Sequence, residues 1–277
     1  MQCLAIFLTA LFSCHFAFAQ IQNPEAKRAS TWYFGLHAGM DFNAPTPTPL
    51  LDNLYDFEQQ NSAGICDLNG NLLFTVWYNQ IYDRDQQPMP GNQTLPNPLY
   101  EDPHSNPYIV PAPGYNSLYY VFWLHDMSFF NPVGQRQLRY SMEYQLVDMA
   151  LNGGKGDLIG GPVLMDSTSG SNFTIVRHCN EKDFWILGAD RETGRFKAWL
   201  LDENGMADTP VWSNNPELTF TGWGESMKMK PSPDGTMLVY SSWDSTPDIL
   251  HSVLSFFDAQ TGVFIHVKKR LKKAKAQ

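Results

Sequence analysis

The tripeptide Arg177-His178-Cys179 is the strongest candidate in the chain for residues whose types and spacing could support chemistry. A histidine next to a cysteine can act as the base that activates the thiol as a nucleophile. Consecutive residues of a strand point to opposite faces, so His178 and Cys179 are predicted not to hydrogen-bond each other. We therefore interpret the tripeptide as the end of a strand, and the pair His125-Asp126 in the same way.

Carboxylates, which could act as acid and base or bind a metal ion, are plentiful. Most lie at turns, where an Asp side chain accepts hydrogen bonds from nearby backbone N–H groups. Retaining hydrolysis of a glycoside needs two carboxylates about 5 Å apart, a distance that the sequence does not determine. The turn Asp67-Leu68-Asn69-Gly70 resembles half of a calcium loop but lacks the later bidentate Glu of an EF-hand. The carboxylates considered are Asp56, Glu58, Asp67, Asp83, Asp85, Asp202 and Asp234.

Signatures of common enzyme and metal sites are absent from the sequence. The chain has no H-E-x-x-H, paired C-x-x-C, P-loop or dinucleotide fingerprint, and no G-x-S-x-G elbow. We therefore predict no catalytic residue, no metal site and no cofactor.

Aromatic side chains could instead bind a ligand by stacking, since the chain has eight tryptophans. Trp77, Trp123, Trp223 and Trp243 lie at strand ends or in loops, so they are the candidates for an exposed ligand-binding face. Packing between sheets is the alternative for each of them, and it is the more common use of a large aromatic side chain.

Four hairpin-like turns recur along the chain, and each leads into a short apolar or aromatic strand. Their central residues are Asn69 and Gly70, Gly114, Asn180 and Glu181, and finally Asp234 and Gly235. The turns lie roughly 45 to 65 residues apart, the spacing of four-stranded propeller blades that carry loop insertions. Alternation and turn residues dominate, and no segment shows sustained helical periodicity.

The predicted fold is therefore all-β, a β-propeller of four-stranded antiparallel blades spanning residues 31–267. About four blades are present, which is fewer than the six to eight that are usual, so we expect an incomplete propeller. An incomplete ring leaves open strand edges, which predicts self-association through those edges. The predicted blades are 31–91, 105–166, 171–213 and 222–267.

The first 19 residues predict secretion. An apolar run over 4–12 is followed by Ala17-Phe18-Ala19, which fits a signal peptide with an A-x-A cleavage site. The alternative is a lipoprotein anchored at Cys14, although Leu11-Phe12-Ser13-Cys14 is a poor lipobox. Residues 20–30 are predicted to form a flexible leader. The expected location is outside the cell or on its outer surface, and no integral membrane segment is predicted.

Cysteines and charges narrow the classes of partner. Cys66 and Cys179 occupy equivalent places in non-adjacent repeats, so we predict two separate, partly buried thiols. Six of the 19 basic residues lie in the last ten, 268–277, which contain no acid; the rest carries 13 basic against 28 acidic residues, a net of −15. An acidic body argues against nucleic acid as a partner. The basic tail is interpreted as a non-native or disordered ending.

Several short segments resemble a known family when taken in order. They are Trp32-Tyr33-Phe34-Gly35, the stretch from Cys66 to Phe74, Val110 to Phe122, Leu146 to Asp157, and Val176 to Asn180. Together these segments resemble the N-terminal propeller region of large secreted Bacteroidetes-type proteins, which often continue into PKD-type domains and a type IX secretion sorting signal. Ser232 to Tyr240 is similar to the WD-repeat-like units of TolB-type propellers.

The resemblance implies a secreted or cell-surface binding or scaffold module without enzymatic activity, whose partner is a protein or glycan at the cell surface. It also implies O-glycosylation of the two D-S-T patterns, at Ser167 and Ser245. A propeller glycoside hydrolase or lyase and a non-functional truncated fragment are the alternatives. No PKD-like or sorting segment follows the fourth repeat, which is where the chain departs from the family.

Overall fold

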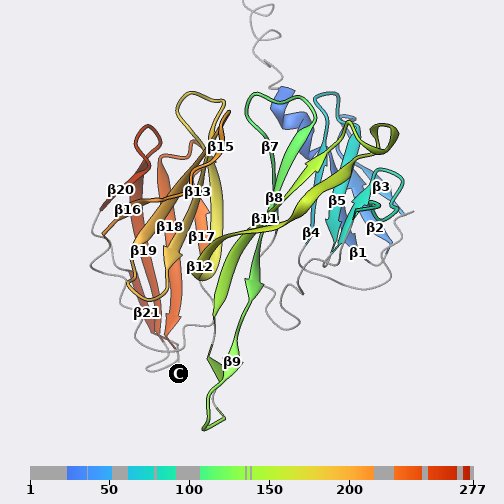
Figure 1. Ribbon diagram of the computed structural model, residues 1–277. Helices are drawn as coiled ribbons and strands as arrows, with labels where there is room; N and C mark the ends of the chain where they lie inside the picture. The colour runs from blue at the N-terminus through green and yellow to red at the C-terminus, as the bar shows by residue number, and fades with distance from the viewer. Residues whose placement is uncertain are drawn as a thin grey trace, which may run out of the picture.

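The computed structural model describes residues 24–35, 37–51, 62–77, 80–91, 107–134, 136–137, 139–214, 228–244, 249–266 and 271–274. These residues form antiparallel sheets and only two short 3-10 helices, η1 (Pro24–Ala29) and η2 (Asn152–Gly154). The predicted all-β class is confirmed. The sheets are arranged in a row across the molecule, from β1–β3 at one side to β17–β21 at the other (Figure 1).

The first predicted repeat, 31–91, consists of two three-stranded sheets rather than one four-stranded blade. One contains β1 (Thr31–Gly35), β2 (Ala38–Asp41) and β3 (Thr48–Leu50), and the other β4 (Ser62–Cys66), β5 (Leu72–Trp77) and β6 (Gln80–Asp83). Pro49 in β3 lacks an N–H donor, which suits an edge strand and ends that ladder. The two sheets lie beside each other, and the Ser62 hydroxyl donates to the Tyr33 carbonyl.

The central sheet has eight strands, and one strand belongs to both of its halves. The first half contains β7 (Tyr108–Pro111), β8 (Leu118–Asp126) and β11 (Tyr140–Asp148), and the second β13 (Phe184–Asp190), β14 (Phe196–Asp202), β15 (Gly205–Met206) and β16 (Val211–Ser213). The 21-residue β12 (Asp157–Arg177) pairs with β11 up to Ser169 and with β13 from Ser169 onward. It is therefore the fourth strand of one meander and the first strand of the next.

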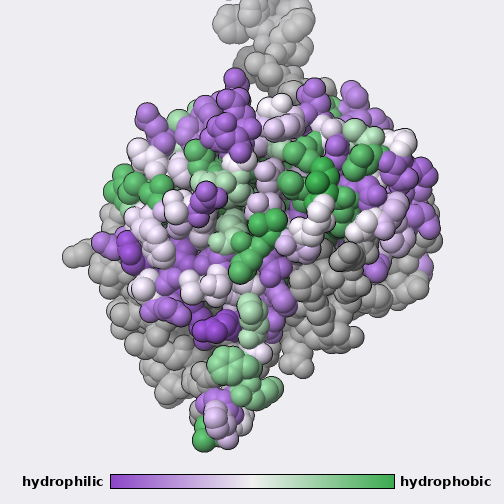
Figure 2. Space-filling view, in the orientation of Figure 1, coloured by the Kyte–Doolittle hydropathy of each residue, from purple (hydrophilic) through white to green (hydrophobic). Residues whose placement is uncertain are grey.

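A small hairpin extends from the β8–β11 connection. It contains β9 (Phe129–Phe130) and β10 (Arg136–Gln137) and projects away from the body (Figure 1). Its apolar side chains, including Phe130 and Val133, are exposed. The hairpin is the lower projection of Figure 2, in which hydrophobic and hydrophilic surface are mixed.

The last sheet contains β17 (Lys228–Pro231), β18 (Met237–Asp244), β19 (Ile249–Asp258), β20 (Val263–His266) and β21 (Leu271–Ala274). Residues 271–274 form β21, a strand within the tail predicted from the sequence to be a non-native or disordered ending. β20 pairs with the second half of β19, so the backbone N–H and C=O groups of the first half of β19 are left open on that edge. β21 pairs with this first half, over Ile249–Ser252.

Three apolar cores lie between successive sheets. One joins β4–β6 to β7, β8 and β11; the next joins the two halves of the central sheet; the third joins β13 and β14 to the last sheet. Alternation along β13 shows how one strand serves two cores, since Trp185 and Leu187 pack toward the last sheet and Phe184 and Ile186 toward the other half. The sheets are thus stacked face to face by their side chains.

The four repeat turns share a left-handed backbone position. Gly70, Gly114 and Gly235 have φ values of 92°, 78° and 71°, and Glu181 takes the same conformation at 61°. Glycine adopts such φ values at little cost, which explains its presence in three of the four turns. Asn69 and Asp234 lie in the same turns.

Candidate functional site

A cavity of about 390 Å³ lies where β4, the first strand of its sheet, meets two strands of the central sheet. β4, β7 and the end of β12 form its walls, and η1 lies against it. Ile65, Val110, Val176 and Phe184 contribute apolar surface and are nearly fully buried. Its charged side is formed by Glu25, Arg28 and Arg177, whose side chains are 32%, 20% and 41% exposed.

The charged side of the cavity is built around one carboxylate oxygen. Glu25 Oε2 accepts hydrogen bonds from Arg28 Nε at 3.0 Å and from Arg177 NH2 at 2.7 Å. Two positive groups therefore converge on one negative group, which leaves this end of the cavity with a formal excess of one positive charge. In a chain whose net charge is −9, this local excess is notable.

Further contacts hold both guanidinium groups in place. Arg177 NH1 donates to the Glu181 carbonyl at 2.8 Å, and its guanidinium carbon lies 5.1 Å from the centre of the Phe184 ring. Arg28 NH1 donates to the Tyr119 hydroxyl at 3.4 Å. A guanidinium has five N–H donors, so donors remain for a ligand in the cavity.

The helix η1 corrects the predicted flexible leader. The sequence predicts a mobile segment over residues 20–30, yet residues 24–29 form a 3-10 helix whose Glu25 bonds to Arg177 of a distant strand. The Glu25–Arg28 pair, three residues apart, supports the helix locally. The short helix could have been predicted from Glu25-Ala26-Lys27-Arg28, in which an acidic residue is followed by basic residues within one helical turn.

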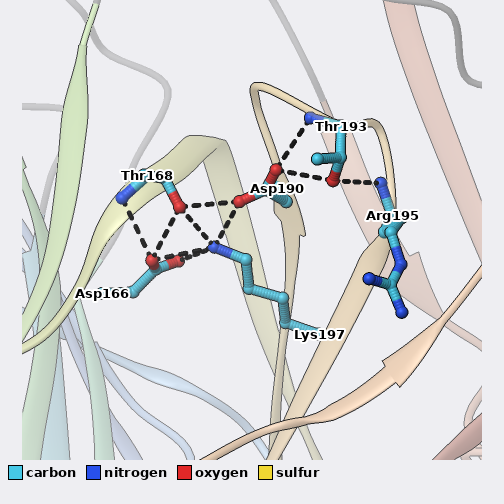
Figure 3. A network of polar contacts seen from close by, with 6 residues as sticks. All are labelled: Asp166, Thr168, Asp190, Thr193, Arg195 and Lys197. Atoms are coloured by element: carbon cyan, nitrogen blue, oxygen red, sulfur yellow. Dashed lines mark hydrogen bonds and ion pairs between the residues drawn. The ribbon is translucent and has the colours of Figure 1, made fainter.

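A second polar cluster is buried where β12 changes partners (Figure 3). Lys197 Nζ, on β14, lies 2.8 Å from both carboxylate oxygens of Asp166 and 2.7 Å from Asp190 Oδ2. Its side chain is 2% exposed, and the two carboxylate side chains are 8% and 5% exposed. The hydroxyl of Thr168 accepts from Lys197 and donates to Asp190.

Asp190 is held ionised by this cluster. Burial alone would raise the pKa of Asp190, but hydrogen bonds from the Lys197 ammonium and from two threonine hydroxyls outweigh it and hold the pKa well below its ordinary value. The atoms of all three charged groups are engaged by each other, so the cluster is a structural ion network. A lone lysine inside the apolar run Phe196–Leu201 is the signal that could have revealed it.

A third cluster joins Ser141, Glu143 and His125 on neighbouring strands β11 and β8. His125 Nδ1 and the Ser141 hydroxyl both contact Glu143 Oε1, at 3.1 and 3.0 Å. The hydrogen bond with Glu143 raises the pKa of His125. Serine and histidine meet the same carboxylate oxygen instead of each other, so the histidine is not placed as a base for the serine.

The structure corrects the expectation for His178 and Cys179. β12 ends at Arg177, so both residues lie in the following turn and strand alternation does not apply to them. Cys179 Sγ is 3.7 Å from His178 Nδ1, although that nitrogen also accepts a hydrogen bond from the backbone N–H of Asn180. The two thiols are free, but Cys179 is exposed, whereas Cys66 is buried. Partial burial of Cys179 was therefore a wrong prediction.

Two of the four candidate tryptophans do not face solvent. Trp77 and Trp123 are 2% and 3% exposed, and Trp123 belongs to the core between β4–β6 and β7, β8 and β11. The prediction of an exposed ligand face is wrong for these two because both faces of β5 and β8 are covered. The side chains of Trp223 and Trp243 lie outside the described residues.

Most predicted carboxylates act as turn caps. Asp67 Oδ1 accepts from the N–H groups of Asn69 and Asn71, and Asp83 Oδ1 accepts from two backbone N–H groups in the same way. The side chain of Ser232 donates to Asp234 and is the main cause of its lowered pKa. Asp85 pairs with Lys155, and Asp202 accepts from the Asn204 N–H. Asp56 and Glu58 lie outside the described residues.

The predicted modification sites have different environments. Ser167 is exposed between Asp166 and Thr168, whose side chains the Lys197 network holds in place. Ser245 lies outside the described residues. O-glycosylation at both positions stays a prediction.

Two further findings concern the described part of the chain. No group of three His, Cys, Asp or Glu side chains there is placed to hold a metal ion. Within the same residues, no helix has the length and apolarity that crossing a bilayer requires.

Comparison with known proteins gives no family for this chain. No protein-family model matches it, and no curated protein matches it with significance. The likeness to secreted propeller proteins therefore stays a prediction from short motifs.

Proposed function

We propose that this chain is a secreted or cell-surface binding module of the β-propeller type, which binds its ligand in the cavity at β4, β7 and β12. The observation that supports this most directly is the convergence of β4, β7 and β12 on one cavity whose lining includes two partly exposed arginines. In a propeller the innermost strands of the blades surround a central channel, which is a common place for a ligand. The predicted signal peptide supports export, and the module would be non-enzymatic.

The cavity favours a ligand with a carboxylate and an apolar body. Arg28 and Arg177 already converge on one carboxylate oxygen of Glu25, so a ligand carboxylate could be bound in the same way. Arginine suits this role because its planar donors match a carboxylate. The apolar walls would bury the rest of the ligand. Acidic glycans and peptides with a free terminal carboxylate at the cell surface both have this chemistry.

The alternative of a glycoside hydrolase or lyase has less support. Glu25 is the one carboxylate among the described residues that line the cavity, and two arginines engage it. Hydrolysis with paired carboxylates needs a second acidic group on the other side of the scissile bond.

Binding to an array of acidic glycans, their neutral counterparts and peptides with free or amidated termini tests the proposal. We expect carboxylate ligands to bind and the Arg177→Ala variant to bind them about 10- to 100-fold more weakly, the loss of a hydrogen bond to a charged group. Lys182→Ala, which removes an exposed charge outside the cavity, is the matched control. Equal affinity of wild type and Arg177→Ala, or equal binding of neutral ligands, would refute the proposed site.

A further inference from the structure

The first and last sheets of the row each expose one apolar face. In an antiparallel sheet at the end of a stack, the outward face normally carries polar side chains. Here both outward faces carry several exposed apolar side chains. We infer that copies of this chain associate head to tail, with the outward face of the last sheet of one copy stacked on the outward face of the first sheet of the next.

The outward face of the last sheet is defined by alternation. Leu238, Tyr240 and Phe257 point inward and are buried against β13 and β14. The residues between them point outward, and register places Val239 opposite Leu254 and Phe256 opposite Ile265. The exposed fractions of Val239, Phe256, Val263 and Ile265 are 42%, 42%, 37% and 55%. Apolar side chains are seen at the margin of the molecule over β20 (Figure 2).

The outward face of the first sheet is aromatic. Trp32, Phe34 and Phe42 are 49%, 51% and 39% exposed, and the Trp32 ring lies 6.3 Å from the Phe34 ring and 5.0 Å from the Phe42 ring. Met40 is opposite Trp32, and Pro49 is opposite Met40, so these two share the same face. The sheet that carries this face lies at the side of the molecule opposite the last sheet (Figure 1).

The way in which sheets pack inside the molecule favours a sheet of a second copy as the partner that covers each exposed face. From β4–β6 through the two halves of the central sheet to the last sheet, neighbouring groups of strands pack apolar faces against each other, in three successive cores. The two end faces carry the same classes of side chain as those buried faces, so stacking a second copy repeats an arrangement that the molecule already uses. An exposed apolar surface of this kind on a soluble protein marks an interaction site.

Charge favours the same occupant. Lys228 and Lys230 are exposed on β17, and Lys230 is opposite Val239, so both lie on the outward face of the last sheet. The chain as a whole has a net charge of −9. Two last sheets placed face to face would bring Lys228 and Lys230 of both copies together, which disfavours that pairing and leaves the head-to-tail one.

Sedimentation velocity of the purified chain over a hundredfold range of concentration tests the inference with two variants. Phe256→Lys/Ile265→Lys disables the last face, and Trp32→Lys/Phe34→Lys disables the first. Val133→Lys, on the exposed β9–β10 hairpin, is the control for an added charge. We expect wild type and control to associate with rising concentration, and each double variant alone to stay at the monomer mass.

A mixture of the two double variants distinguishes head-to-tail association from pairing of identical faces. Each variant retains one intact face, so the mixture should form dimers and nothing larger, because a head-to-tail contact does not close on itself. A monomeric wild type would overturn the inference. The inference would also be overturned if either double variant associated on its own and the mixture formed no dimer. If a double variant fails to fold by circular dichroism, Ile265→Ser and Trp32→Ser replace the pairs, with association weakened at least tenfold as the expected result.

Discussion

Replacing Lys197 by Met tests the structural role of the buried ion network. The side chain of methionine is similar in length but carries no charge, so Asp166 and Asp190 would remain as two buried carboxylates without their cation. Removing one partner of a buried ion pair costs about 3–5 kcal/mol. With a denaturant slope of about 3 kcal/mol/M in urea, the unfolding midpoint at pH 7 should fall by roughly 1–2 M.

The pH dependence of this loss follows from the lowered pKa of Asp190. A carboxylate whose pKa is lower in the folded than in the unfolded protein contributes stability above its unfolded pKa, about 3.9, and loses it as the pH falls through the folded pKa. Without Lys197, two carboxylates share one buried site, which raises their pKa and favours protonation. The difference between wild type and variant should therefore be large at pH 7 and smaller near pH 4.

Urea unfolding followed by tryptophan fluorescence at pH 4 to 8 measures both effects. Lys182→Met, at an exposed position, is the control and should change stability by less than about 0.5 kcal/mol. Lys197→Met/Asp166→Asn/Asp190→Asn removes all three charges and should recover part of the loss, since no unpaired charge stays buried. A loss below about 1 kcal/mol at pH 7, or one that does not change with pH, would refute the reasoning.

Two further measurements address the other clusters. Exposed Cys179 should react with a thiol reagent in the native protein, whereas Cys66, whose pKa is raised by burial, should react only after unfolding; equal rates would contradict this. The pKa of His125 is raised by Glu143, so the stability that this pair contributes is present below pH 6.5 and is lost as the pH rises through the folded pKa. The urea midpoint should therefore fall more from pH 6 to pH 8 in wild type than in Glu143→Gln. An equal fall in the two proteins would contradict a stabilising His125–Glu143 pair.

Local rules account for what the sequence predicts well. The turns at Gly70 and Gly235 need a left-handed backbone conformation, and an Asp nearby accepts from the turn N–H groups, so a few adjacent residues specify them. Strand alternation likewise predicts the all-β class. At Glu181 the same conformation occurs without glycine, so residue type alone does not predict it there.

Features that depend on distant contacts could not be predicted in this way. Trp77 and Trp123 lie at strand ends, and whether such a side chain is exposed depends on which sheet covers that face. β21 forms because part of β19 has an open edge, which is a property of the folded sheet and not of residues 271–274. The cavity needs residues from η1, β4, β7 and β12, which are far apart in the chain.

The position of the Lys197 network explains how the cavity keeps its shape. β12 is shared by two meanders, and its pairing is irregular between Ser169 and Phe173, where it changes partners. The sequence there is Ser-Gly-Ser-Asn, which offers no apolar side chain to select a face. A slip of one residue would turn Arg177 away from Glu25 and move Val176 out of the core. Asp166 and Thr168 precede this stretch and are tied to β13 and β14 by buried charges, which define one geometry where hydrophobic alternation does not. The network thereby ties β12 to β13 and β14 just before the segment that carries Arg177 into the cavity lining.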